Sequence, residues 1–249
     1  MSEDQQAGHE RPAAEAGGAS TMASPAAPKR RRMPLGLEIL IAIVAVALVQ
    51  AFLVKPFGVP SQSMETTLGI GDRIVVNRLP HQVARGDIVV FGHGDTWEQT
   101  HRPPAAGLTA VMRFLGDLTG IGPSNTNYTV KRVIGLPGET VSCCSTAGQV
   151  LVDGKPLTET YIFENLPFDE GAGGCAAATP AMRCFGPIRV PEDSYLVMGD
   201  HRSQSADSVI ACRGSTASGI GCAKFVHRDR IVGPVVFRLW PLTAFGTVT

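Results

Sequence analysis

The hydrophobic pattern is strongest near the amino end of the chain. Residues 37–54 read LEILIAIVAVALVQAFLV, in which Glu38 and Gln50 are the strongly polar side chains. With a rise of about 1.5 Å per helical residue, roughly 18 to 20 residues span about 27 to 30 Å, which matches the apolar core of a bilayer. We therefore predict a transmembrane helix over residues 34–55.

The flanks of this apolar run orient it. A basic cluster, Lys29–Arg32, stands directly before it, and basic residues beside a membrane segment mark its cytoplasmic side. Lys55–Phe57 follow it in place of the small-x-small site of a cleavable signal, which favours a permanent anchor. Residues 1–33 are poor in branched and aromatic side chains, so we expect a disordered cytoplasmic tail. Residues 56–249 then form an extracytoplasmic domain.

Beyond residue 56 the pattern changes to short β-branched runs bounded by Gly-Asp and Pro-Gly turns, which is typical of strands. Such runs occupy residues 71–78, 85–91, 128–139, 150–157 and 189–198, and a final strand pair is expected within 231–240. No two segments there have the length and period of core helices. The pattern predicts a mainly β, antiparallel domain, with a loop over the Gly-, Ala- and Pro-rich residues 165–187.

A stretch over residues 92–127 interrupts the strand pattern. Apolar side chains recur in it at helical spacing, at Leu108, Val111, Leu115 and Leu118. We predict a surface insertion with one amphipathic helix over residues 106–119. Its apolar stripe packs on the domain or lies on the membrane surface, and the sequence leaves both open.

Composition excludes some classes of function. Lys and Arg number 22, as do Asp and Glu, so nothing indicates a nucleic-acid partner. All six cysteines lie in the predicted extracytoplasmic part, where disulfides form. Local bonds Cys175–Cys184 and Cys212–Cys222 are favoured because they bracket segments without a core of their own. Cys143 and Cys144 are free, bonded to each other or bonded elsewhere, and a zinc site is disfavoured because no CxxC pair has a matching partner.

Three polar segments are candidates for chemistry. Ser61 and Ser63 stand in a turn soon after the apolar run. In the strand that follows residue 127, Lys131 and Arg132 point to opposite faces, so one cation can be buried while the other meets solvent. A Lys buried among Val and Thr has a lowered pKa. The alternative is that both cations extend along the sheet surface into water. The third segment, residues 199–208, is a polar turn at the end of a strand.

Four segments behind the apolar run together resemble the sequence boxes of bacterial type I signal peptidases. In order they are PFGVPSQSMETTL, GDRIVVNR, YTVKRVIGLPGE and MGDHRSQSADS. The resemblance extends over residues 36–240. It implies a partly open barrel of antiparallel strands and a Ser/Lys endopeptidase that removes signal peptides from exported preproteins at the outer face of the bacterial cytoplasmic membrane. It implies no cofactor and no metal, and we expect a monomer whose partners are preproteins and the lipid bilayer.

The resemblance also assigns roles to the catalytic residues. Ser63, directly before Met in its box, matches the nucleophile, and Lys131 matches the general base. Ser61 matches a serine whose hydroxyl completes the oxyanion hole with the main-chain N–H of the nucleophile. Such a pair is a variant of the triad logic, because a serine hydroxyl attacks poorly until a neighbouring base takes its proton.

The last box supplies the supporting residues. Ser205 matches a serine that positions the lysine, while Asp200 and Asp207 match acidic supporting positions. This chain also departs from the family pattern, which often has Pro at Thr66 and Arg at Val209. The family's usual Asn-Arg-Asp-Asn is replaced by a segment whose differing residues are His201, Ser203 and Gln204.

The position of the serine turn fits a substrate held at a membrane. Val54 and Ser63 are separated by nine residues, which reach at most about 30 Å when extended. We expect an extended substrate beside a strand, with two shallow apolar pockets for small side chains. Two alternatives remain. One is a catalytically silent domain that binds exported proteins, which is disfavoured by the joint presence of Ser61, Ser63, Lys131 and Ser205. The other is an autoproteolytic regulator, which would need a DNA-binding domain.

Overall fold

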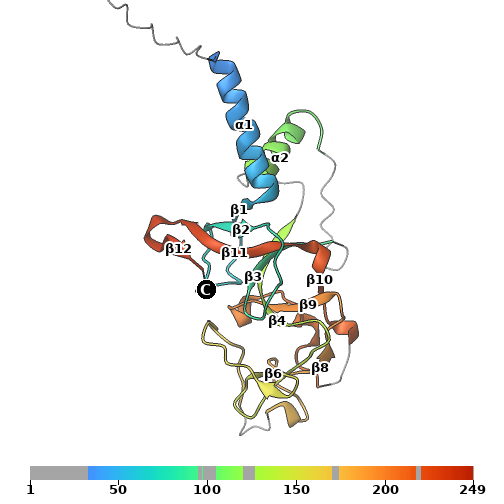
Figure 1. The fold of residues 1–249 in the computed structure, drawn as a ribbon. Helices are drawn as coiled ribbons and strands as arrows, with labels where there is room; N and C mark the ends of the chain where they lie inside the picture. Colours follow the sequence, from blue (N-terminus) through green and yellow to red (C-terminus); the bar gives the residue numbers. More distant parts are fainter. Residues whose placement is uncertain are drawn as a thin grey trace, which may run out of the picture.

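The computed structural model describes residues 33–94, 97, 105–119, 127–169, 174–216 and 220–248. The tail predicted over residues 1–33 lies almost entirely outside the described residues. Strands dominate the described part, which also contains two α-helices (Figure 1). The prediction of a mainly antiparallel β domain is confirmed. The partly open barrel implied by the resemblance is not observed: the strands form two open sheets, one of eight strands and one of four.

The large sheet runs in the order β1-β2-β11-β3-β4-β9-β10, with β12 paired to β11. Its strands are β1 (Val54–Gly58), β2 (Arg73–Asn77), β3 (Ile88–Gly92), β4 (Tyr128–Gly135), β9 (Ser194–Met198), β10 (Val226–His227), β11 (Ile231–Trp240) and β12 (Gly246–Thr247). All of these pairings are antiparallel. Strand β4 lies between β3 and β9, so its backbone is paired on both sides.

Strand β11 corrects one prediction. Residues 231–240 form a single strand and not a pair, although Gly233 and Pro234 lie inside it. The first part of β11 pairs with β3 and the second with β2, and register shifts occur along both pairings. These irregularities let one long strand bend from one neighbour to the next, which a flat ladder with an internal Pro could not do.

The small sheet has the order β7-β6-β5-β8. It consists of β5 (Thr140–Cys143), β6 (Val150–Val152), β7 (Lys155–Pro156) and β8 (Phe185–Arg189). It lies at the end of the molecule opposite the two helices (Figure 1). The loop predicted over residues 165–187 ends early, because β8 already begins at Phe185. The strand predicted over 189–198 is divided by a turn before β9.

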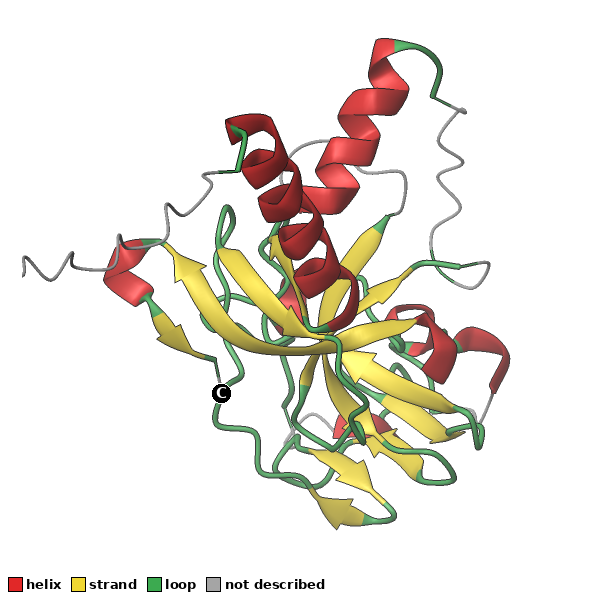
Figure 2. Ribbon diagram, turned by 45° about the horizontal axis from the view of Figure 1, so that its top comes forward, coloured by secondary structure: helices red, strands yellow, loops and turns green. Residues whose placement is uncertain are grey.

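Helix α1 (Leu35–Phe52) follows the apolar run, and helix α2 (Leu108–Thr119) confirms the helix predicted in the insertion. The two helices lie side by side (Figures 1 and 2), and α1 leads into β1 at the edge of the large sheet. Within the described part of the chain, no helix combines the length and apolarity required to cross a membrane. The last two residues of the span predicted over 34–55 belong to β1, because Val54 and Lys55 pair with β2.

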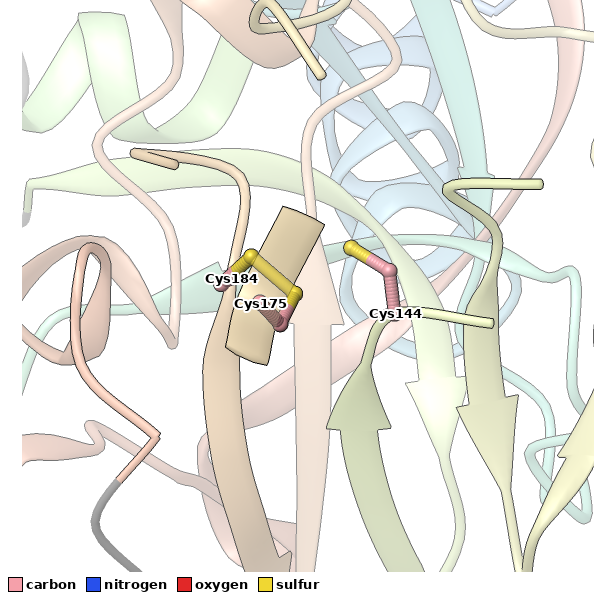
Figure 3. Close-up of side chains that lie close together, drawn as sticks. All are labelled: Cys144, Cys175 and Cys184. Atoms are coloured by element: carbon pink, nitrogen blue, oxygen red, sulfur yellow. A yellow bond between two sulfur atoms is a disulfide. The ribbon is translucent and has the colours of Figure 1, made fainter. Parts of the chain in front are cut away.

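Three disulfides connect the six cysteines. The bonds Cys175–Cys184 and Cys212–Cys222 were predicted, and of the options left open for the other two, the structure has Cys143 bonded to Cys144. The sulfurs of Cys144, Cys175 and Cys184 lie within 4.8 Å of one another, with Cys144 beside the Cys175–Cys184 bond (Figure 3). Zinc is held by thiolates, whereas these sulfurs are in disulfides.

Gly233 marks the tightest backbone approach in the large sheet. Its φ is +153°, and an added Cβ would lie 1.8 Å from the carbonyl oxygen of Asn77. Gly233→Ala should therefore lower the free energy of unfolding by roughly 2 to 4 kcal/mol, because the strand must shift. Denaturant titration of the purified protein measures this. Gly221→Ala, where a Cβ meets nothing within 4 Å, is the control, and equal midpoints for the two variants would contradict the prediction.

Candidate active site

The serine turn is held in place by buried apolar side chains. Met64 and Leu68 are fully buried in a core shared with β1 and β2. The backbone N–H of Leu68 donates to the Met64 carbonyl oxygen at 2.7 Å, which closes the turn. Ser63 stands directly before Met64 and is itself buried. The apolar residues of the turn thus fix a polar side chain that would otherwise be solvated.

Strand β4 brings Lys131 to this serine. The Nζ atom of Lys131 donates a hydrogen bond to Ser63 Oγ, which joins residues 68 positions apart in the sequence. Both Lys131 and Arg132 are buried. The expectation that one of the two cations meets solvent is therefore wrong, as is the alternative that both do. Both faces of β4 are covered, so each cation must find its own partner.

Burial lowers the pKa of Lys131 from 10.5 to about 8, and the carboxylates of Asp207 and Asp200 oppose part of this shift. Desolvation destabilises the ammonium form more than these two charges stabilise it. A large fraction of the lysine is then neutral near pH 8. A neutral amine at hydrogen-bond distance from Ser63 Oγ can accept the hydroxyl proton.

Asp200 and Arg132 form a buried ion pair on the other face of β4. Arg132 Nε lies 2.9 Å from Asp200 Oδ1, and Nη2 lies 2.8 Å from Oδ2. Thr67, in the serine turn, donates from Oγ1 to Asp200 Oδ2 at 2.6 Å. The guanidinium also lies over the Tyr161 ring, at 3.9 Å from its centroid. Asp200 thus joins the serine turn to β4, as expected of a supporting residue.

Asp207 is paired with an arginine that the sequence reasoning missed. Val209, where the family often has Arg, is fully buried among apolar residues. Arg213 takes up the ion pair instead: its Nη2 lies 2.9 Å from Asp207 Oδ2, and its Nη1 donates to the Arg202 carbonyl oxygen at 2.9 Å. The sequence signal that could have indicated this pair is the position of Arg213 directly after Cys212, in the loop closed by the predicted Cys212–Cys222 bond.

His201 stands where the family usually has Asn, and it braces the serine turn. Its Nδ1 lies 3.2 Å from the Gln62 carbonyl oxygen, and its Nε2 lies 3.2 Å from a carboxylate oxygen of Glu164. The backbone N–H of His201 donates to the Ser63 carbonyl oxygen at 3.2 Å. The departure at His201 thus preserves contact with the turn. Nothing in the structure explains Thr66.

The two other predicted serines lie close to Ser63. Ser61 Oγ lies 3.3 Å from Ser63 Oγ. Ser205 Oγ is buried and has no hydrogen-bond partner among the described residues, so a bond from Ser205 to Lys131 is not observed. Ser205 packs against Gly199, where an added Cβ would fall 2.4 Å from both Ser205 Oγ and the Ser63 carbonyl oxygen. A residue with no side chain at 199 lets these two segments approach.

Two unequal cavities meet at Ser63. The smaller, about 30 Å³, is enclosed by the start of the serine turn and of β4, with Val59, Met64 and Val130 in its walls. The larger, about 430 Å³, contains Lys131 and reaches across to the segments that carry Gln204, Ile210 and Lys224. A substrate bond at Ser63 would therefore lie between a narrow space and a wide one.

The chain matches a family of known proteins over most of its length. The family model described as "Signal peptidase, peptidase S26" matches residues 32–240. The chain belongs to this family. It is a serine endopeptidase of the signal peptidase I type.

Curated relatives cover most of the enzyme. A "Probable signal peptidase I" of Mycobacterium leprae is 30% identical over 239 residues, with 88% of this chain and 81% of the relative covered. A "Signal peptidase I" of Leptolyngbya laminosa is 32% identical over 215 residues, with 85% and 79% covered. A solved signal peptidase I from Enterococcus faecalis matches with a TM-score of 0.32 and 21% identity, covering 62% of this chain and 97% of that one.

The pKa of Lys131 can be tested directly. NMR titration of lysines labelled at Cε should show one that titrates near pH 8 and is absent from Lys131→Met. Asp207→Asn should move that midpoint to lower pH, because the Asp207 carboxylate raises the pKa of Lys131. Asp229→Asn, at an exposed aspartate, is the control and should leave it unchanged. A midpoint near 10.5, or an upward shift in Asp207→Asn, would contradict the assignment.

Proposed function

We propose that this enzyme cleaves signal peptides from exported preproteins with Ser63 as nucleophile and Lys131 as general base. The observation that carries the proposal is the hydrogen bond between Lys131 Nζ and Ser63 Oγ at a buried site. Burial lowers the pKa of the amine to about 8, which makes a neutral base accessible at ordinary pH.

Each step then has a group to perform it. Neutral Lys131 takes the proton of Ser63 as Oγ attacks the scissile carbonyl carbon, and a tetrahedral oxyanion forms. The Ser61 hydroxyl and the backbone N–H of Ser63 donate to that oxyanion. The C–N bond breaks as the Lys131 ammonium returns its proton to the leaving amine. Water then enters, and Lys131 takes one of its protons as the water oxygen attacks the ester carbon. The C–O bond to Ser63 breaks as the Lys131 ammonium returns this proton to Ser63 Oγ, which restores the free hydroxyl and the neutral amine.

The narrow cavity supports a substrate with small side chains before the cut. Its volume of about 30 Å³ holds roughly one water-sized group. Signal peptides end in small residues of the A-x-A type, and such residues fit where a Leu or Phe would not. The ready hydrogen bond between base and nucleophile favours an active enzyme over a silent binding domain.

We also propose that the two helices hold the enzyme at the bacterial cytoplasmic membrane. Leu40, Ile43 and Val46 of α1 are each more than half exposed, as are Leu108 and Phe114 of α2. Side chains of this kind are stabilised when lipid replaces water around them. Contact of these helices with lipid would keep Ser63 close to the bilayer. The orientation with the amino end in the cytoplasm and residues from 56 onward outside stays a prediction.

Substitution of the proposed pair should abolish cleavage. With a purified preprotein in detergent, Ser63→Ala and Lys131→Ala should lower the rate by a factor on the order of 1000 or more, because each removes the nucleophile or its base. Ser61→Ala should lower it by about 100- to 1000-fold, the usual effect of one lost oxyanion donor. Gel analysis of preprotein and mature product measures all three rates.

The control for this assay is Lys155→Ala, at an exposed lysine on β7. It should cleave at the wild-type rate. Because the base is the neutral amine, the wild-type rate should rise as the pH passes through about 8. Normal processing by Ser63→Ala or Lys131→Ala, or a flat rate from about pH 6 to pH 9, would exclude the proposed mechanism.

Membrane binding is tested by flotation with phospholipid vesicles. The wild type should float, and a variant with Leu40→Glu and Ile43→Glu should remain in the dense fractions. Each charge placed in the middle of an apolar helix costs about 2.5 to 3.5 kcal/mol in lipid. Met182→Glu, at a residue that is 59% exposed and lies away from both helices, is the control. Equal flotation of the double variant and the wild type would contradict anchoring by α1.

A further inference from the structure

Apart from the site residues Ser61, Ser63, Lys131 and Asp207, the residues that line the wide cavity have no role in the mechanism. Its volume of about 430 Å³ is more than ten times the 30 Å³ of the narrow one, and both include Ser63. If the narrow cavity takes the small residue before the scissile bond, the chain after that bond must leave through the wide cavity. This placement rests on the proposed function. The difference in volume means that side chains of any size can follow the cut.

The charges in the wide cavity are not balanced. Asp207 lies in its wall, but Arg213 neutralises this carboxylate at 2.9 Å. Lys131 is engaged with Ser63 and must be neutral to act as a base. Lys224 is the remaining cation in the wall, and its ammonium has no hydrogen bond or ion pair among the described residues. An exposed cation without a partner beside a substrate path attracts an anionic group.

The backbone around Lys224 is held firmly, although its side chain is exposed. Its N–H donates to the Ser208 carbonyl oxygen at 2.9 Å. The next residue, Phe225, is buried, and its carbonyl oxygen accepts a bond from Trp97 Nε1 at 3.2 Å. Trp97 lines the same cavity. The base of the lysine side chain is thus fixed at the rim, so its charge stays near the cavity.

We propose that the wide cavity binds the first residues of the mature protein after the cut, and that Lys224 recognises an acidic side chain among them. The ligand class is an Asp or Glu side chain on an extended peptide. Because Lys224 is exposed, the preference is modest: a factor of about two to five in kcat/KM, the range measured for exposed ion pairs. It should decrease at high salt, since exposed charges are screened.

The experiment compares three matched substrates that carry Glu, Gln or Lys at each of the first three positions after the scissile bond. Wild-type enzyme should cleave the best-placed Glu substrate about two- to fivefold faster than its Gln counterpart, with the Lys substrate slowest. Lys224→Gln should remove the difference between Glu and Gln. Lys224→Glu should reverse the order, so that the Lys substrate is cleaved faster than the Glu substrate. The conservative variant Lys224→Arg should retain the wild-type order.

Lys155→Gln serves as the charge-matched control, because it removes an exposed lysine on β7 and should keep the wild-type preference. Equal cleavage of all three substrates by the wild type, or a preference that survives unchanged in Lys224→Gln, would overturn this inference alone. The proposed function fails separately, through cleavage by Ser63→Ala. A Glu preference that persists at about 1 M salt would also count against a contact at an exposed lysine.

Discussion

The burial of one amine beside one hydroxyl is the constraint on which the rest of the structure depends. Lys131 can serve as a base only where water is excluded, and it is useful only where Ser63 is within hydrogen-bond distance. Strand β4 meets the first condition because it is paired on both sides and covered on both faces. The buried Met64 and Leu68 meet the second by fixing the serine turn.

Excluding water from this region buries other charges as well, and each is paired. Arg132 forms an ion pair with Asp200, Arg213 with Asp207, and Arg202 with the buried carboxylate of Glu159. Such pairs add little net stability, since desolvation offsets most of their attraction. Here they connect segments far apart in the chain, and they affect the pKa of Lys131. The carboxylates of Asp207 and Asp200 raise this pKa, whereas burial lowers it by a larger amount.

The small sheet and the candidate active site lie in different regions of the molecule. The small sheet and its disulfides lie at the end opposite the helices (Figure 1), whereas Lys131 lies on β4 of the large sheet and Ser63 in the turn between β1 and β2. Two cavities of very different volume both have Ser63 in their walls. This asymmetry suits the proposed function, in which a small residue precedes the cut and residues of many sizes follow it.

The sequence by itself determined the β class, the helix near residues 108–119 and two disulfides, because periodicity and short motifs are local. It also named six candidate site residues, through the resemblance of four segments to the boxes of a known family. Only the tertiary structure decided that β11 is one strand, that both cations of β4 are buried, and that Arg213 partners Asp207. Each of these depends on contacts between distant segments: the pairing of β11 with two neighbours, the covering of β4, and a loop closed by Cys212–Cys222. A local sequence pattern does not indicate which distant side chain will form a given ion pair. The sequence therefore showed that Val209 lacks the usual arginine, but it did not show that Arg213 pairs with Asp207 instead.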